Sequence, residues 1–146
     1  MAINQISVFL ENKPGQLAEF TRLLEQNQID MRALSIAETQ DFGILRLIVD
    51  DPYDTVNVAK DAGYICAVTS VLAIEIPDKP GSLVKMLSVL GEAGINVEYT
   101  YAFLTRKKDV AYMIFRVNDP DKASEVLVRG GVRPLAQDDL AALFAD

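Results

Sequence analysis

The sequence predicts an α+β protein built from two copies of one β-α-β-β-α-β unit, and three observations support this. Short runs of alternating apolar residues, typical of strands, are separated by segments with apolar residues every three or four positions, typical of helices. The order strand, helix, strand, strand, helix, strand occurs twice in the 146 residues. The copies share a register, because Pro80-Gly81 follows Pro14-Gly15 by the same interval in the numbering as Ile95 follows Ile29.

The first copy contains all six elements of this order. Leu17, Phe20 and Leu24 recur at helical spacing after the first alternating run. Asp51-Pro52 predicts a helix start, with aspartate as N-cap and proline in the first turn, and Gly63 ends that helix. The predicted strands are 6–10, 29–38, 44–49 and 64–69, and the predicted helices are 16–26 and 53–62.

The second copy repeats the order and adds one helix. Pro120 and Gly131 correspond to Pro52 and Gly63. Each of them lies two residues further from its counterpart than Pro80-Gly81 lies from Pro14-Gly15. We therefore place two extra residues in the hairpin at 105–109, because loop tips tolerate insertions. The predicted strands are 72–76, 95–104, 110–117 and 132–135, and the predicted helices are 82–93, 120–129 and the added 138–144.

Each copy matches the ferredoxin-like split β-α-β arrangement, in which both helices cover one face of a four-stranded antiparallel sheet. The linker Ser70-Val71 is very short and lacks glycine and proline, so we expect the copies to pack rigidly. The second strand of each copy is a sheet edge, and edges seek partners. We therefore predict two domains, residues 1–70 and 71–146, packed side by side into a continuous eight-stranded antiparallel sheet with the helices on one face.

Composition argues against several classes of function. With 50% hydrophobic and 24% charged residues the chain is globular. Its net charge of -7 argues against a nucleic acid or an anionic membrane surface as partner. Histidine is absent and Cys66 is the only cysteine, which removes histidine-dependent nucleophiles, the usual zinc ligands and any internal disulfide. We therefore expect a cytoplasmic protein that needs no metal or cofactor. An enzyme that uses carboxylates or lysines stays possible on composition alone, although the sequence has no Walker loop and no GxGxxG, HExxH or CxxC motif.

Two stretches carry a family resemblance. In each copy an apolar strand leads into Asp/Asn-Lys-Pro-Gly-x-Leu, then an amphipathic helix, then Gly/Gln-Ile-Asp/Asn and an apolar residue. This pattern resembles the ACT domain over residues 3–70 and 71–136. The second copy matches it better, because the first has Gln28 where the second has Gly94. ACT domains are regulatory modules, and many bind an amino acid at the interface of two such domains. Because the resemblance covers nearly all of the sequence, it implies an allosteric sensor that is not an enzyme.

The Pro-Gly loops are the candidate carboxylate sites, because glycine leaves backbone amides uncovered at a helix N-terminus, where partial positive charge collects. Within one copy, the loop and the Asp30 or Asn96 that opens the second strand lie a strand length apart, about 17–20 Å. If the two edge strands pair antiparallel, Asp30 lies beside the second loop and Asn96 beside the first, where their oxygens would bind the ammonium of an amino acid. We expect the charged Asp30 to make the tighter site. The candidate ligand-binding residues are Asn12, Lys13, Pro14, Gly15, Gln16, Leu17, Asp30, Met31, Asp78, Lys79, Pro80, Gly81, Ser82, Leu83, Asn96 and Val97.

Simpler interpretations of the same residues stay open. Asn12 and Asp78 also suit helix caps, the Pro-Gly pairs also suit plain turns, and the neighbouring lysines also suit solvated side chains. A purely structural oligomer without ligand is the main alternative function. An RNA-binding fold would need aromatic residues on a basic sheet face, and the predicted central strand 44–49 contains no aromatic residue. An acylphosphatase-type enzyme would need an arginine in the loop after the first strand, and both Pro-Gly loops lack arginine. The expected partners are an amino acid, a regulated enzyme or other protein, and a second copy of the chain.

Overall fold

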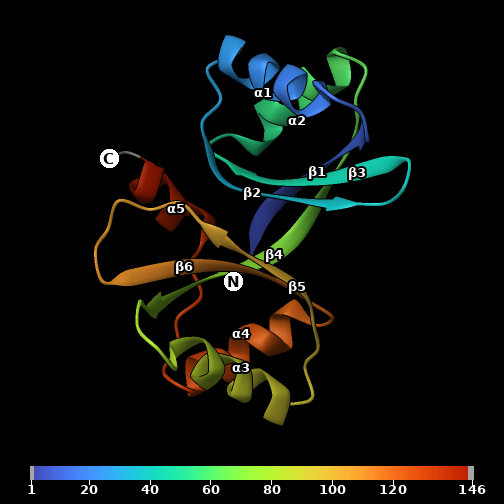
Figure 1. The fold of residues 1–146 in the computed structure, drawn as a ribbon. Helices are drawn as coiled ribbons and strands as arrows, with labels where there is room; N and C mark the ends of the chain where they lie inside the picture. Colours follow the sequence, from blue (N-terminus) through green and yellow to red (C-terminus); the bar gives the residue numbers. More distant parts are fainter. Residues whose placement is uncertain (1, 145–146) are drawn as a thin grey trace. The chain divides into compact units, whose positions relative to one another are not determined.

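The computed structural model describes residues 2–144, which divide into two compact units (Figure 1). The first repeat is the unit Asn4–Thr69, and the second repeat is the unit that runs from Ser70 onward and includes Ile3. The elements in chain order are β1 (Ile3–Glu11), α1 (Gln16–Gln26), β2 (Met31–Glu38), β3 (Phe42–Val49), α2 (Pro52–Asp61), β4 (Ile65–Pro77), α3 (Ser82–Glu92), β5 (Val97–Phe103), β6 (Val110–Val117), α4 (Pro120–Arg129) and α5 (Gln137–Phe144).

The core of the first repeat lies between its strands and its two helices. β3 pairs antiparallel with both β1 and β2, and side chains alternate between the two faces of a strand. Phe20 and Leu24 of α1 and Ala59 of α2 pack on the apolar face, so both helices cover the same side of these strands (Figure 1). The buried residues of this core are Ile6, Val8, Leu10, Phe20, Leu24, Ile29, Leu45, Leu47, Val49 and Ala59.

The core of the second repeat uses equivalent positions. β6 pairs antiparallel with both β4 and β5. Met86 and Leu90 of α3 are buried against these strands, and in the shared register they correspond to Phe20 and Leu24. Leu127 of α4 corresponds to Ala59 and is likewise fully buried. The two cores are thus built to one plan, as a duplicated unit requires.

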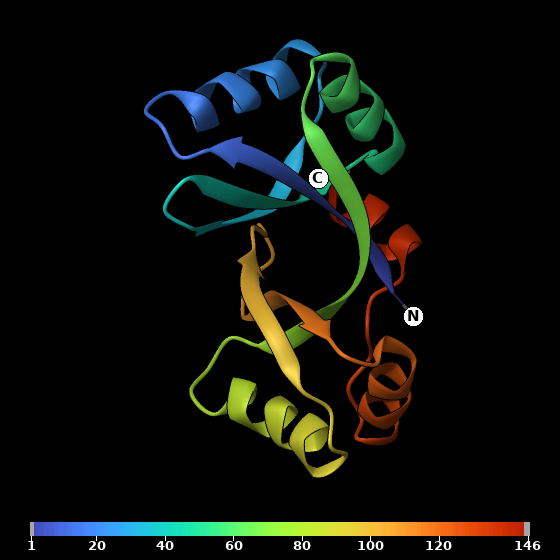
Figure 2. The ribbon, with the colours of Figure 1, turned by 90° about the vertical axis from the view of Figure 1, so that its right-hand side faces the viewer.

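The strand count differs from the prediction. The predicted strands 64–69 and 72–76 are one continuous strand, β4, which is the long green strand of Figure 2. The described residues form six strands in the order β1-β3-β2-β5-β6-β4, which closes as a barrel. The predicted continuous eight-stranded sheet is therefore wrong. Ser70-Val71 contains no residue that interrupts a strand, so the alternating pattern continues through it.

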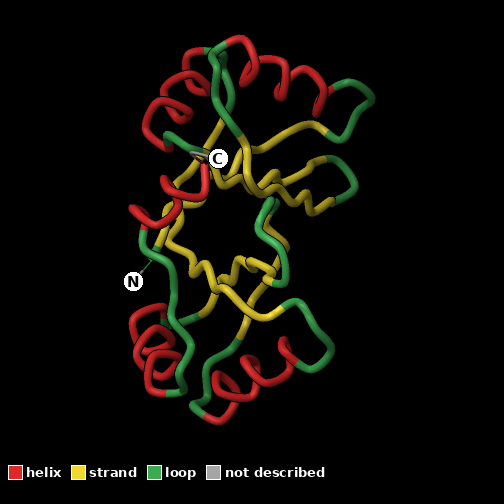
Figure 3. The backbone as a smooth tube through the Cα atoms, turned by 90° about the vertical axis from the view of Figure 1, so that its left-hand side faces the viewer, coloured by secondary structure: helices red, strands yellow, loops and turns green. Residues whose placement is uncertain are grey.

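The predicted strand 132–135 is also not formed in the part of the chain that the structure describes. Its place is taken by an isolated bridge between Ile74 and Pro134, beside which the Leu135 N–H donates to the Ala73 carbonyl at 2.8 Å. Proline has no N–H to donate to a strand ladder. The chain between α4 and α5 therefore runs mainly as loop (Figure 3).

The helices that follow Asp-Pro begin as predicted. Asp51 accepts a hydrogen bond from the Asp54 N–H at 3.0 Å, and Asp119 accepts one from the Lys122 N–H at 3.1 Å. Each bond satisfies a backbone donor that has no partner within the helix. The predicted N-cap at Asp51 is confirmed, and Asp119 caps the equivalent helix of the second repeat.

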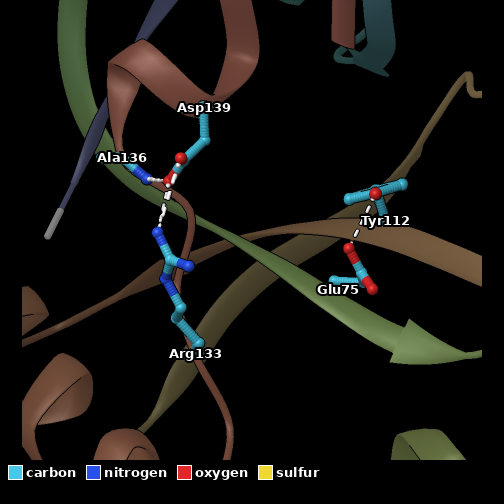
Figure 4. A network of polar contacts seen from close by, with 5 residues as sticks. All are labelled: Glu75, Tyr112, Arg133, Ala136 and Asp139. Carbon is cyan, nitrogen blue, oxygen red and sulfur yellow. Dashed lines mark hydrogen bonds and ion pairs between the residues drawn. The ribbon is translucent and has the colours of Figure 1, made fainter. Parts of the chain in front are cut away.

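The added C-terminal helix is present as α5, and a side chain of its first turn secures the loop before it. Asp139 accepts a hydrogen bond from the Ala136 N–H at 2.7 Å, which is the acidic half of a capping box. Arg133 donates to the same carboxylate at 3.3 Å (Figure 4). The loop at 133–136 is therefore tied to the start of α5.

A second polar contact joins β4 to β6 within the second repeat. The Tyr112 hydroxyl donates to the Glu75 carboxylate at 2.7 Å (Figure 4), and the two residues are cross-strand partners. Lys107 Nζ lies 3.6 Å from the same carboxylate. Burial, followed by the hydrogen bond to Glu75, raises the pKa of Tyr112 to about 12.

Tyr112→Phe is expected to make the protein less sensitive to alkali. The ordinary tyrosine pKa is 10.0, and the folded protein holds the proton more tightly. The resulting stabilisation is complete below pH 10 and is lost as the pH rises through the folded pKa of about 12. Urea unfolding across this range measures it. If wild type and Tyr112→Phe lose stability in parallel, the hydroxyl makes no such contribution.

Candidate functional site

Both Pro-Gly loops end in a glycine that caps the following helix. Gly15 has a φ of 84° and Gly81 a φ of 90°, a left-handed conformation that other residues rarely adopt. Neither helix has a side-chain hydrogen bond at its N-cap, so Asn12 and Asp78 are not the caps. Because the first amides of an α-helix have no acceptor within the helix, α1 and α3 each present N–H groups with partial positive charge.

The loops are held by the tips of the neighbouring hairpins. The Asn12 N–H donates to the Asp41 carbonyl at 3.0 Å, and its side-chain amide donates to the Thr39 carbonyl at 3.2 Å. In the second repeat the Asp78 N–H donates to the Asp109 carbonyl at 2.9 Å. These bonds give Asn12 and Asp78 a structural role, because they anchor each loop to the tip of its own repeat's hairpin.

Asn96 lies at the opposite end of its repeat from the Pro-Gly loop. Pro77, which precedes the loop, pairs with Val110 at the start of β6. Val97, which follows Asn96, pairs with Val117 at the end of β6. The length of β6 therefore separates the loop from Asn96, and one small ligand cannot touch both within the repeat.

Asp30 and Asn96 have equivalent backbone contacts but different side-chain surroundings. The Asp30 N–H donates to Asp50 Oδ1 at 3.2 Å, and the Asn96 N–H donates to Asn118 Oδ1 at 3.0 Å. Asp30 Oδ2 also lies 3.1 Å from Arg32 Nη2. An ammonium ion at Asp30 would share the carboxylate with this guanidinium, so the advantage of Asp30 over Asn96 is smaller than charge alone implies.

Met31 and Val97, the expected contacts for a ligand side chain, begin β2 and β5. Each is partly buried and packs against the core of its own repeat. Their apolar character is therefore explained by packing, whether or not a ligand also touches them.

The loop of the second repeat opens onto a cavity of about 900 Å³, which we call the second-repeat cavity. Residues 79–82 of the loop line it, together with the end of β4, one side of α3 and the chain after α4. Lys79, Lys85 and Arg133 contribute positive charge to its walls. Glu75 is the acidic residue of the lining, and its carboxylate is occupied by Tyr112 and Lys107.

The loop of the first repeat lines a different and smaller cavity, of about 340 Å³. It lies between the loop and the β2–β3 hairpin, so that Ile36 and Glu38 join Asn12, Lys13, Gln16 and Leu17 in its walls. Lys13 is engaged by Glu11 at 2.6 Å, and this contact raises the pKa of Lys13. The two loops therefore present different chemistry despite their matching sequences.

Many residues that line these cavities are not among the predicted site residues, including Lys85 and Arg133 in the second repeat and Ile36 and Glu38 in the first. For the first pair a signal existed. Lys85 stands where the first repeat has Glu19, and Arg133 stands where it has Ile65. A position-by-position comparison of the two copies would have found both changes of charge.

Two kinds of feature are absent from the described residues, 2–144. None of the helices there is long and apolar enough to cross a membrane. The same residues contain no group of three or more histidine, cysteine, aspartate or glutamate side chains that could hold a metal ion.

The fold and the paired loops define a protein made of two ferredoxin-like units joined in one chain. A family model described as an ACT domain pair matches residues 1–144, and the chain belongs to this family. The family resemblance of the sequence is therefore confirmed. A search of curated proteins finds no match.

Solved structures agree with this assignment. Protein BT0572 from Bacteroides thetaiotaomicron is 42% identical, with a TM-score of 0.90 over 97% of this chain and 96% of that one. The ligand-free regulatory subunit of aspartate kinase from Thermus thermophilus is 14% identical, with a TM-score of 0.66 over 87% of this chain and 91% of that one. At that identity the second likeness shows a shared fold.

Proposed function

We propose that the chain is a non-catalytic regulatory protein that senses an amino acid through its Pro-Gly loops. The observation that carries this proposal is that each loop leads into a helix N-terminus with no side-chain cap and lines a cavity. Unpaired amides at a helix N-terminus favour a carboxylate. Membership of the ACT domain pair family supports a regulatory role, and the fold is one that aspartate kinase regulatory subunits also use.

A thermal-shift screen against the standard amino acids tests the proposal. A ligand present at 100 times its dissociation constant stabilises the folded state by about 2.7 kcal/mol. We expect one amino acid or a small group of similar ones to raise the melting temperature. If none does, the alternative of a structural module without ligand is favoured.

The ammonium group is assigned to Asp30 and Asn96. Calorimetric titration of Asp30→Ala and Asn96→Ala is expected to show the loss of one binding event in each variant. Because Arg32 already neutralises part of the Asp30 charge, the two losses should be similar in size. Arg32→Gln should strengthen binding at Asp30. Unchanged titrations in both alanine variants would remove Asp30 and Asn96 from the site.

Regulation needs a partner, and we propose a protein partner whose contact with this chain depends on the bound amino acid. A second copy of the chain is the other proposed partner. Sedimentation with and without the amino acid found in the thermal screen measures self-association. A mass that is monomeric in both conditions would leave only a different protein as the regulated target.

A further inference from the structure

In the first repeat, the place that corresponds to the second-repeat cavity is occupied by an aromatic pair. Phe20 and Tyr64 contact each other edge to face, with ring centres 4.9 Å apart and planes at 83°. In the shared register the equivalent residues of the second repeat are Met86 for Phe20 and Val132 for Tyr64. Both line the second-repeat cavity. The second repeat therefore lacks the ring that covers this part of the core in the first.

The equivalence of Tyr64 and Val132 rests on backbone geometry as well as on numbering. The Tyr64 N–H donates to the Ala59 carbonyl at 3.0 Å, and the Val132 N–H donates to the Leu127 carbonyl at 2.8 Å. Each bond reaches back to the same position of the preceding helix and follows a glycine with positive φ. The two side chains therefore start from the same backbone position in their repeats.

A change in strand pairing opens the cavity further. In the first repeat the residues after Tyr64 continue as β4. In the second repeat Pro134 stands where Cys66 does, and pairing with β4 is reduced to one bridge at Ile74. Residues 130–133 of this chain segment and Glu75 of β4 both line the cavity.

The far end of this chain segment is nevertheless held in place. A Cβ atom on Gly130 would lie 3.3 Å from a side-chain methyl of Val89 on α3. A larger residue at Gly130 would therefore have to displace Val89, so the backbone of Gly130 and the side chain of Val89 are closely packed. The cavity therefore has a packed end at Gly130 and Val89, as well as the tie between Arg133 and Asp139 at the start of α5.

The charge at this place is inverted between the repeats. In the first repeat, burial and then the nearby Glu19 carboxylate raise the pKa of Tyr64. The residue equivalent to Glu19 is Lys85, and the residue equivalent to the apolar Ile65 is Arg133. With Lys79 this makes three cations around the cavity, in a chain whose net charge is -7. One of them, Arg133, is partly neutralised by Asp139.

We propose that the second-repeat cavity, which the second Pro-Gly loop also lines, binds a small organic dianion. Lys79 and Lys85 supply two charges that a dianion would neutralise, and Arg133 borders the other side. Apolar side chains of the walls, including Val84 and Val132, would cover the carbon part of the ligand. Dicarboxylates and phosphate monoesters share this chemistry. The inference goes beyond amino-acid sensing and does not depend on it.

Calorimetric titration at constant ionic strength tests the proposal with three probes, which are glutarate, glycerol 3-phosphate and inorganic phosphate. We expect one of the two organic dianions to bind. The comparison between them decides whether the natural ligand is a dicarboxylate or a phosphate monoester. Inorganic phosphate should bind more weakly than the better organic probe, because it has no apolar part. Equal binding of all three ions would overturn the proposal, because the apolar walls would then contribute nothing.

Two variants rebuild the first repeat's chemistry in the second. Lys85→Glu restores the acidic residue of the first copy, and Val132→Tyr restores its aromatic ring. Each is expected to weaken binding of the better organic probe at least ten-fold, the first by reversing a charge and the second by filling space. Lys60→Glu, an equal charge change on exposed α2 of the first repeat, is the matched control and should leave affinity within about two-fold, since Lys60 does not line the cavity.

The outcomes separate this inference from the proposed function. Binding that survives both Lys85→Glu and Val132→Tyr, in proteins whose circular dichroism matches wild type, overturns the proposed cavity site. Should Val132→Tyr fail to fold, Lys85→Glu decides alone, because Lys85 is exposed on α3. Dianion binding without any amino-acid response would contradict amino-acid sensing and leave the cavity site standing. An amino-acid response without dianion binding would support amino-acid sensing and overturn the cavity site.

Discussion

Phe20→Ala is expected to lower the free energy of unfolding by about 3–5 kcal/mol. Phe20 is fully buried in the core of the first repeat. The centre of its ring lies 4.9 Å from the centre of the Tyr64 ring. Truncation removes both the buried area and the aromatic contact, and it leaves a void that close-packed neighbours fill only in part. Urea denaturation followed by circular dichroism measures the loss.

Phe42→Ala is the matched control for Phe20→Ala. Phe42 is the same residue type in the same repeat but is 55% exposed, so its removal should change stability by less than about 1 kcal/mol. If both variants lower the free energy of unfolding by the same amount, Phe20 does not stabilise the core in the way that its burial implies.

Gly81→Ala is expected to lower the free energy of unfolding by about 1–2 kcal/mol. A Cβ at Gly81 would meet no atom within 4 Å, so the cost comes from the left-handed backbone, whose φ is 90°. Alanine at this position is either strained or shifts the loop to a different backbone conformation. A shifted loop would also misplace the amides that we assign to the carboxylate. The variant should therefore lose both stability and ligand binding at the second loop.

Gly91→Ala supplies a control of opposite sign in the same helix. Gly91 lies inside α3 with ordinary φ, and a Cβ there also meets nothing within 4 Å. Alanine in a helix interior is favoured over glycine by about 0.5–1 kcal/mol. We therefore expect Gly91→Ala to stabilise the protein and leave ligand binding unchanged. A loss of stability there would mean that steric space, and not backbone conformation, governs both glycines.

Most helices and strands could be predicted because their causes are local. Asp51 and Asp119 cap helices through bonds to amides in the first turn, and Gly63 and Gly131 follow helices with positive φ. The repeat spacing then aligned two cores whose buried positions match. The error at β4 has a different origin, because the sequence shows where a strand could run but contains no stop at Ser70.

The candidate site was predicted less completely. The glycine caps of α1 and α3 follow from the residues themselves, since few other residues adopt their φ. The contrasting walls of the two cavities depend on residues far apart in the chain, such as Lys85 and Arg133. No periodicity or motif brings these two together, and only the path of the chain after α4 does so.

The duplicated β-α-β-β-α-β unit and its two glycine-capped loops could be predicted from the residues alone, because periodicity, caps and left-handed turns are properties of short segments. How the strands join, and how the two loops differ, could be seen only in the folded protein. Those outcomes depend on which distant segments pack together, as where Tyr64 covers the core of the first repeat while Val132 leaves a cavity in the second.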